Sequence, residues 1–263
     1  MTASVPKAAL DAPFDLAREL AVTGSVARGW ADEWSDVELM ALVDELPAEE
    51  RVREWYPGSL AEVDAQGDIV WADGEIDGLK VELVFQRLAG VERLVERILA
   101  CEVHEHVELR TAEAIVNARI VRGDRVRAWQ ARLGRYPPEL TRVLVRRAVG
   151  PWESQPKLGI VRRGDRLPVA SALVRDAFAI LRILHAVNHR WEPTWKWTAR
   201  RVDELDAKPP RAAERIEAAL VAPDPVAAVR AMAGLARETL ELVPPDVDVA
   251  LARRNLDEVL AAL

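Results

Sequence analysis

Three acidic residues and a Gly-Ser pair are the residues whose types and spacing could do chemistry. Ten residues separate the Gly24-Ser25 pair from Asp36, and Glu38 and Glu82 complete the set. Residues i and i+2 of a strand share a face, so Asp36 and Glu38 are expected to point the same way. Adjacent carboxylates repel unless a cation or proton lies between them, and Mg²⁺ binds carboxylates together with substrate phosphates. The acids therefore predict a metal site, in which Glu82 is either a third ligand or a general base.

The Gly24-Ser25 pair predicts a phosphate-binding turn. A small-residue turn between a strand and a helix exposes backbone N–H groups, and here a serine hydroxyl, to an incoming phosphate. Arg28 is a candidate for a further charge-assisted hydrogen bond to that phosphate, with an ordinary surface arginine as its alternative. Ser35, which precedes the first acid, is another candidate ligand-binding residue, with a turn or capping role as its alternative.

A small mixed sheet with helices is needed to position these residues. Alternating and apolar patterns predict strands at 37–43, 68–71, 79–86 and 115–122, and amphipathic patterns predict helices at 14–21, 47–56 and 89–100. Beyond residue 127 the pattern becomes helical, with helices at 171–189, 211–221, 225–242 and 247–262. The sequence therefore predicts an α+β protein with a mixed-sheet domain at 1–127 and an all-helical domain at 128–263.

The apolar helix expected at 171–189 carries an ionisable stripe. Arg175, Arg182, His185 and His189 are spaced so that they share one side. Such a stripe either lines a cleft for phosphate or acceptor, or faces solvent, or pairs with acids of a neighbouring helix.

Three tryptophans, Trp191, Trp195 and Trp197, follow that helix. They predict either core packing against the N-terminal domain or a wall on which a ring stacks. The run CEVHEHVE at 101–108 lacks a second cluster that would complete a closed zinc site, so zinc is not predicted.

Composition excludes several classes of protein. A net charge of −7 disfavours a general nucleic-acid binder, and a single cysteine excludes a disulfide framework. No apolar run of about 18 residues is present, so a membrane span is not expected. The first residues lack the pattern of a signal peptide, and a cytoplasmic protein is the expectation.

The run GSVARGWADEWSDVELMALV at 24–43 resembles the signature of the polymerase-β-like nucleotidyltransferase superfamily. Followed by a helical C-terminal half, it is similar to antibiotic nucleotidyltransferases of the lincosamide and aminoglycoside type. The resemblance implies a nucleotidyltransferase fold in the first domain and a helical bundle that closes the cleft and selects the acceptor. The sequence departs from the commoner pattern at Glu38, where Asp is more usual.

This resemblance implies a reaction and a set of roles. Gly24 and Ser25 would bind the triphosphate, Asp36 and Glu38 would ligate Mg²⁺, and Glu82 would be the third ligand or the base. A nucleoside monophosphate, expected to be AMP from ATP, would pass to a hydroxyl of a small molecule, for example an aminoglycoside or lincosamide antibiotic, with release of pyrophosphate.

Relatives of the streptomycin type also contribute an arginine and a later lysine to the triphosphate, and Arg182 and Lys196 have that spacing. Some antibiotic nucleotidyltransferases build the site across a homodimer. The alternatives are a protein-adenylylating enzyme of a toxin–antitoxin system and a catalytically silent nucleotide-binding relative. An RNA-directed transferase is disfavoured by the acidic charge.

Overall fold

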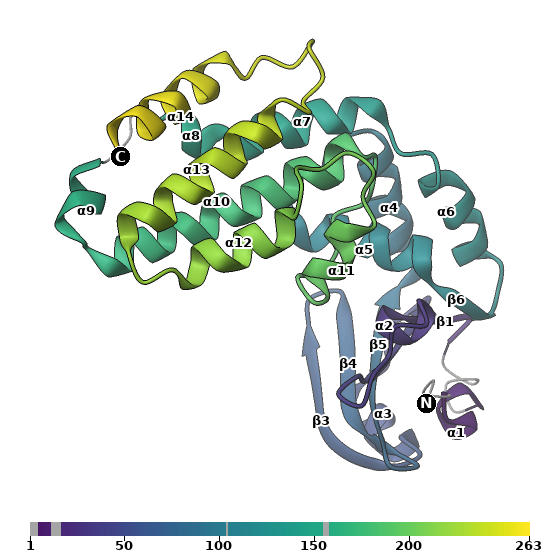
Figure 1. The fold of residues 1–263 in the computed structure, drawn as a ribbon. Helices are drawn as coiled ribbons and strands as arrows, with labels where there is room; N and C mark the ends of the chain where they lie inside the picture. The colour runs from purple at the N-terminus through teal and green to yellow at the C-terminus, as the bar shows by residue number, and fades with distance from the viewer. Residues whose placement is uncertain (1–4, 12–16, 104, 155–157) are drawn as a thin grey trace. The chain divides into compact units, whose positions relative to one another are not determined.

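The computed structural model describes residues 5–11, 17–103, 105–154 and 158–263. The chain divides into two compact units, residues 1–135 and 136–263 (Figure 1). The first unit holds a six-stranded sheet with helices, and the described elements of the second unit are all helices. The expected α+β class, with a mixed sheet followed by an all-helical part, is confirmed. The expected boundary after residue 127 falls inside the helix at 125–133, and this whole helix belongs with the first unit.

The sheet of the first unit has the strand order β3-β4-β5-β2-β1-β6. The strands are β1 (Glu19–Thr23), β2 (Val37–Val43), β3 (Ser59–Gln66), β4 (Ile69–Ile76), β5 (Leu79–Arg87) and β6 (Arg119–Arg122). Strands β2 and β5 pair in parallel, whereas the other neighbours pair antiparallel, so the sheet is mixed.

The β4–β5 hairpin has its register fixed by a two-residue turn. Asp77 and Gly78 both have positive φ, 53° and 78°, as an Asp-Gly type I′ turn requires. This turn places Asp73 of β4 directly opposite Glu82 of β5.

The helices of the first unit are α1 (Lys7–Asp11), α2 (Gly24–Ala27), α3 (Glu49–Trp55), α4 (Leu88–Leu99), α5 (His106–Asn117) and α6 (Arg125–Leu133). One apolar core joins alternate residues of the strands, such as Leu39, Leu83 and Phe85, to Val52 of α3 and Ala9 of α1. Because side chains alternate along a strand, the acids between these apolar positions lie on the opposite face.

Most expected elements are present, and two are wrong in part. Strands 37–43 and 79–86 and helices 47–56 and 89–100 correspond to β2, β5, α3 and α4. The strand expected at 68–71 is longer and runs to Ile76.

The helix expected at 14–21 is wrong where it can be checked, since Glu19–Thr23 is strand β1, and residues 14–16 lie outside the described residues. This strand is buried at all five positions, so it has no alternation to reveal it. The strand expected at 115–122 begins only at Arg119, because residues up to Asn117 complete α5. Strand β3 was not expected, because it is polar and lies at the edge of the sheet.

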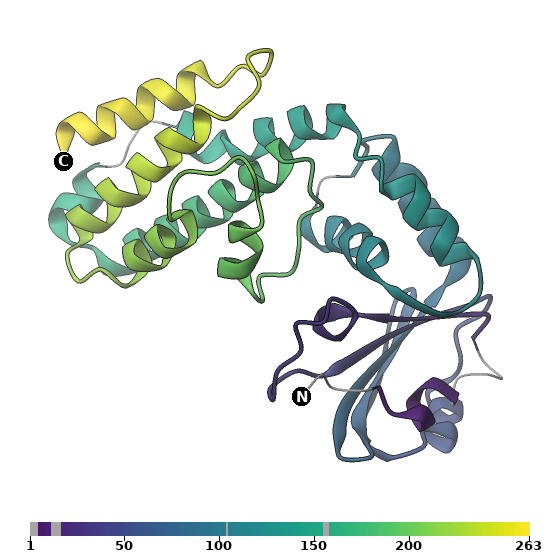
Figure 2. The same cartoon turned by 45° about the vertical axis from the view of Figure 1, so that its right-hand side comes forward.

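The second unit is built around α10 (Arg166–Val187), which packs against α7 (Pro138–Ala148), α12 (Ala212–Val221) and α13 (Pro225–Leu240) (Figure 2). The others are α8 (Gly150–Glu153), α9 (Leu158–Arg163), α11 (Thr198–Asp203) and α14 (Ala250–Ala262). Helices α10, α12, α13 and α14 confirm the helices expected at 171–189, 211–221, 225–242 and 247–262. No helix in the described ranges is long and apolar enough to cross a bilayer.

A buried carboxylate ties the sheet of the first unit to α6. Glu19, at the start of β1, is 7% exposed and accepts hydrogen bonds from the backbone N–H groups of Asp124, Arg125 and Val126 at 3.2, 2.9 and 3.4 Å. These N–H groups open the first turn of α6, where a negative charge is favourable.

Replacing Glu19 by glutamine should lower the free energy of unfolding by about 1–3 kcal/mol, because charge-assisted hydrogen bonds become neutral ones. Glu45→Gln, at an exposed position of the same unit, should change it by less than about 0.5 kcal/mol. Urea unfolding of both variants measures the difference, and equal effects would contradict the capping role.

Candidate functional site

The three predicted acids occupy neighbouring positions on two strands. Glu38 of β2 is the register partner of Glu82 of β5, and Asp36 immediately precedes β2. Register partners share a face, and neighbouring strands lie about 4.8 Å apart. Val37, Leu39 and Val81 are buried in the core, so the acids lie on the other face. The structure thus brings Glu38 and Glu82 together, as the sequence predicted, and leaves Asp36 next to them.

These acids form a row along two strands. Among the described residues, no group of three or more His, Cys, Asp or Glu side chains is arranged to hold a metal ion by itself. Mg²⁺ does not need such a cage, because it is usually held by one or two carboxylates, waters and substrate phosphates. The all-oxygen donor set of Asp36, Glu38 and Glu82 fits that mode of binding.

Gly24 packs directly on the carboxylate of Glu38. Its φ is +65°, and a Cβ placed on it would lie 2.6 Å from Cδ and Oε2 of Glu38. A larger residue here would be strained by the left-handed backbone and would have to displace the Glu38 carboxylate. Gly24 and Ser25 also open the short helix α2, whose first turn receives no cap from the Thr23 side chain. The structure thus sets the expected phosphate-binding turn beside the expected metal ligand.

Arg28 supports this turn from within the protein. Its side chain is 7% exposed and forms an ion pair with Glu113 of α5, which is also 7% exposed. It donates a second hydrogen bond from Nη1 to the carbonyl oxygen of Gly24 at 2.6 Å, and its guanidinium lies 5.8 Å from the Trp30 ring centroid. These contacts give Arg28 a structural role that the sequence did not indicate, and a bond from it to phosphate stays a prediction.

Glu113 is a residue that sequence reasoning missed. It lies 85 positions from Arg28, and it also accepts a hydrogen bond from Nδ2 of Asn117 at 3.1 Å. An acid inside an amphipathic helix was the available signal, but the sequence pattern did not predict a helix at 106–117, and its last residues were expected to be a strand.

Ser35 takes part in a hydrogen-bonded turn before the acids. Its Oγ donates to Oδ1 of Asp32 at 2.8 Å and accepts from the N–H of Asp32 at 3.0 Å. The N–H of Trp34 donates to the same Asp32 oxygen at 3.0 Å. The structure therefore shows the turn role of Ser35, and its contact with a ligand stays a prediction.

Asp73 and Lys80 extend the acid row, and neither was singled out from the sequence. Asp73 faces Glu82 in register, and Oδ2 of Asp73 lies 3.3 Å from Nζ of Lys80. The hydrogen bond that Lys80 donates to Asp73, the charge of Asp73 and the charges of Asp36 and Glu82 raise the pKa of the Lys80 ammonium. The Asp-Gly turn between the strands was the signal that could have paired these residues.

In the second unit, Arg182 is held by a buried carboxylate. Its Nε and Nη2 donate to both carboxylate oxygens of Glu192 at 2.9–3.2 Å, and the Glu192 side chain is 1% exposed. An ion pair was one of the alternatives for this residue, although Glu192 lies in the segment after α10 rather than on a neighbouring helix. Lys196 lies in the same segment between α10 and α11. Their part in nucleotide binding stays a prediction.

The other three residues of the ionisable stripe, Arg175, His185 and His189, lie in different environments. His185 is buried, with Nδ1 2.8 Å from the carbonyl oxygen of Leu181, whereas Arg175 pairs with the adjacent Asp176 at 3.3 Å. His189 stacks on Tyr136 with ring centroids 5.4 Å apart. His185 is therefore a core residue.

Two of the tryptophans after α10 pack within the second unit. Trp191 lies 4.8 Å from Tyr136 and Trp195 stacks on Phe178 at 4.6 Å between ring centroids. Phe178 is 41% exposed, so its ring is partly accessible to solvent.

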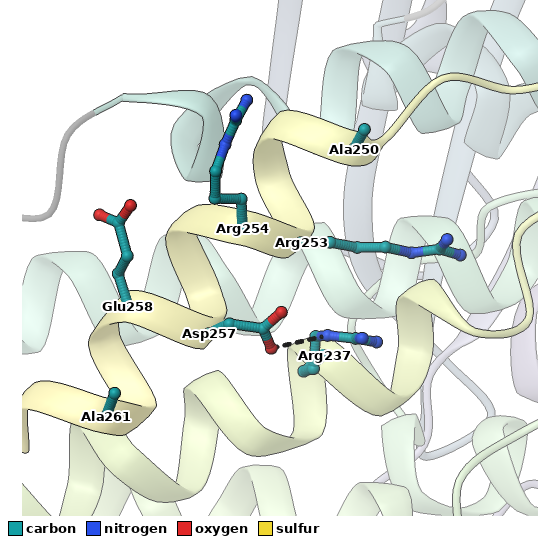
Figure 3. Close-up of a pocket in the computed structure, with 7 residues that line it drawn as sticks. All are labelled: Arg237, Ala250, Arg253, Arg254, Asp257, Glu258 and Ala261. Carbon is teal, nitrogen blue, oxygen red and sulfur yellow. Dashed lines mark hydrogen bonds and ion pairs between the residues drawn. The ribbon is translucent and has the colours of Figure 1, made fainter.

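A pocket of about 570 Å³ lies on the second unit, between α13 and α14 (Figure 3). It is lined by Arg237, Ala250, Arg253, Arg254, Asp257, Glu258 and Ala261. Arg237 donates to Asp257 at 2.9 Å, and Arg253 donates to the carbonyl oxygen of Leu240 at 2.7 Å. None of the sequence-predicted site residues lines this pocket.

No family model matches the sequence, and no curated protein matches it. Among solved structures, it is similar to the 1.90 Å crystal structure of a nucleotidyltransferase-like protein from Exiguobacterium sibiricum 255-15. The identity is 13%, the match covers 97% of this chain and 72% of that chain, and the TM-score is 0.37. The likeness is distant in both sequence and geometry.

Alanine at position 24 should cost more than alanine at position 67. Gly67 has a similar φ of +60° but nothing within 4 Å of its missing Cβ, so Gly67→Ala measures backbone strain alone, about 1–2 kcal/mol. Gly24→Ala must also displace the Glu38 carboxylate, which is the end of a flexible side chain, and it should cost about 0.5–1.5 kcal/mol more in urea unfolding. Equal losses would show that the contact with Glu38 is not tight.

Removing Arg28 alone should be more damaging than removing both members of its ion pair. Arg28→Met removes the guanidinium that pairs with the buried Glu113 carboxylate, which should lower the free energy of unfolding by about 3–5 kcal/mol. Arg28→Met combined with Glu113→Gln should recover part of that loss. A double-mutant cycle in urea measures this coupling, and simple additivity would contradict it.

Proposed function

We propose that this protein is a Mg²⁺-dependent nucleotidyltransferase. It moves a nucleoside monophosphate, with AMP from ATP as the first candidate, to a hydroxyl group of a small molecule and releases pyrophosphate. The observation that supports this most is the pairing of Glu38 with Glu82 beside the Gly24-Ser25 turn. Carboxylates next to a phosphate-binding turn are the groups that a metal-bound triphosphate requires.

Each residue has a role in this reaction. Gly24 and Ser25 bind the far end of the triphosphate through N–H groups and the serine hydroxyl. Asp36 and Glu38 would hold Mg²⁺, which neutralises phosphate charge when bound. The acceptor oxygen attacks the α-phosphorus, the bond to the β-phosphate oxygen breaks, and pyrophosphate leaves. Glu82 either takes the proton of the acceptor hydroxyl or completes the metal ligands.

The second unit is proposed to select the acceptor and to contribute to triphosphate binding. The resemblance of the 24–43 run, followed by helices, to antibiotic nucleotidyltransferases favours an aminoglycoside or lincosamide as acceptor. Arg182 and Lys196 are proposed to contact the triphosphate. Transfer to a protein, and nucleotide binding without turnover, are the outcomes that the experiment separates from this one.

The test is pyrophosphate release from ATP, GTP, CTP and UTP with Mg²⁺ and a panel of aminoglycosides, lincosamides and other polyols. Asp36→Asn with Glu38→Gln should reduce acceptor-dependent release by at least about 10³-fold, because the charge that binds the metal is lost. Asp44→Asn with Glu45→Gln, just beyond the other end of β2, is the matched control and should retain activity.

Calorimetry of Mg²⁺–nucleotide binding accompanies this assay. Binding without release points to a protein acceptor or a silent relative. The absence of nucleotide binding would refute the proposed function.

A further inference from the structure

We infer that Arg28 and Glu113 set the nucleotide affinity of this protein by fixing the orientation of one peptide group, the one between Gly24 and Ser25. The inference rests on the proposed function, because this peptide belongs to the proposed phosphate-binding turn. Both are positioning residues, which act on the nucleotide through the backbone.

The side chain of Arg28 holds the carbonyl end of this peptide. Its Nη1 donates to the carbonyl oxygen of Gly24 at 2.6 Å. A peptide group is planar and trans, so its C=O and N–H bonds point in opposite directions. The bond from Arg28 therefore turns the N–H of Ser25 away from the guanidinium. In the proposed function, this N–H is one of the donors to phosphate.

Gly24 needs such a restraint. Its φ is +65°, and the absence of a side chain gives its backbone a wide conformational range, so the peptide that follows it can rotate at little steric cost. A rotated peptide would present a carbonyl oxygen in place of the N–H, and an oxygen that only accepts hydrogen bonds cannot bind phosphate oxygens. The bond from Arg28 opposes this rotation.

Glu113 holds the guanidinium in the position that this bond requires. The side chains of Arg28 and Glu113 form an ion pair, and each is 7% exposed. Nη2 of Arg28 binds the carboxylate while Nη1 binds the Gly24 oxygen, so one rigid planar group makes both contacts. Glu113 also accepts a hydrogen bond from Nδ2 of Asn117 within α5, at 3.1 Å. The turn is thereby attached to α5.

The same burial distinguishes this role from direct binding of phosphate by Arg28. A phosphate on the guanidinium would compete with the Glu113 carboxylate, and separating a buried ion pair is costly. The two roles predict opposite effects of neutralising Glu113. A direct phosphate ligand would become more available, whereas a positioning residue would lose its anchor.

Calorimetry of Mg²⁺–ATP binding to the full chain separates the two roles. Glu113→Gln should weaken binding about 3- to 10-fold and Arg28→Met about 10- to 30-fold, because a smaller fraction of molecules then holds the peptide in the competent orientation. Arg28→Lys, which keeps the charge without the planar fork, should lie between Arg28→Met and wild type. Glu19→Gln, which alters another buried carboxylate of the same unit, is the control and should stay within about twofold of wild type.

Two further readouts distinguish positioning from a general loss of stability. Arg28→Met combined with Glu113→Gln should regain part of the stability that Arg28→Met loses, but none of its nucleotide affinity. Serine-selective isotope labelling gives a second readout, because Ser25 is one of six serines in the chain. In the nucleotide-free protein, the amide signal of Ser25 should shift in Glu113→Gln and stay in place in Glu19→Gln.

Mg²⁺–ATP binding that is unchanged or tighter in Glu113→Gln than in wild type would overturn the inference and leave the proposed function intact. Weakening of the same size in Glu19→Gln would also overturn it, because the effect would then follow stability alone. If wild type itself does not bind Mg²⁺–ATP, the proposed function is refuted, and the positioning role with it.

Discussion

The parallel pairing of β2 with β5 is the constraint on which the candidate site depends. It brings Glu38 opposite Glu82, although the two residues are 44 positions apart in the sequence. A shift of one residue would turn Glu82 toward the core and an apolar neighbour toward solvent. The alternating apolar residues of both strands oppose such a shift, since Leu39 and Leu83 are each 2% exposed. The hydrophobic core thus fixes the position of the charged face.

Two buried carboxylates of the first unit are stabilised by specific hydrogen-bond donors. Glu19 and Glu113 are nearly inaccessible, and each is engaged by strong donors, the N–H groups of α6 and the Arg28 guanidinium. Those donors repay the cost of removing a charge from water. The acids of the row lie on the face of the sheet opposite the apolar core, and Lys80 forms an ion pair with Asp73. Glu19 and Glu113 therefore have structural roles, whereas the acids of the row are the oxygen donors of the proposed metal site.

Sequence reasoning succeeded where one face of an element differs from the other. The alternation in 79–86 placed Glu82 opposite the apolar residues, and Asp36-Val37-Glu38 was recognised in the same way. It failed for β1, which is buried throughout, and at 115–118, where apolar residues belong to the end of α5 and the turn after it. The partners of Arg28 and Arg182 could not be predicted, because Glu113 is brought near by the fold and Glu192 by a turn after α10. The pattern of apolar residues shows which face of an element is buried, whereas the partner of a charged side chain depends on the tertiary structure.

The arrangement of the acids also bears on the order of assembly. A row along two strands provides few metal ligands in fixed geometry, and the described residues contain no preformed cage. Mg²⁺ prefers six oxygen ligands and gives up its waters reluctantly, so phosphate oxygens complete its shell more readily than further side chains. Gly24 lies against the Glu38 carboxylate, so the proposed phosphate-binding turn and the proposed metal ligand are adjacent. In the proposed function, metal and nucleotide therefore bind as one unit, and the close contact of Gly24 with Glu38 is the structural reason for that coupling.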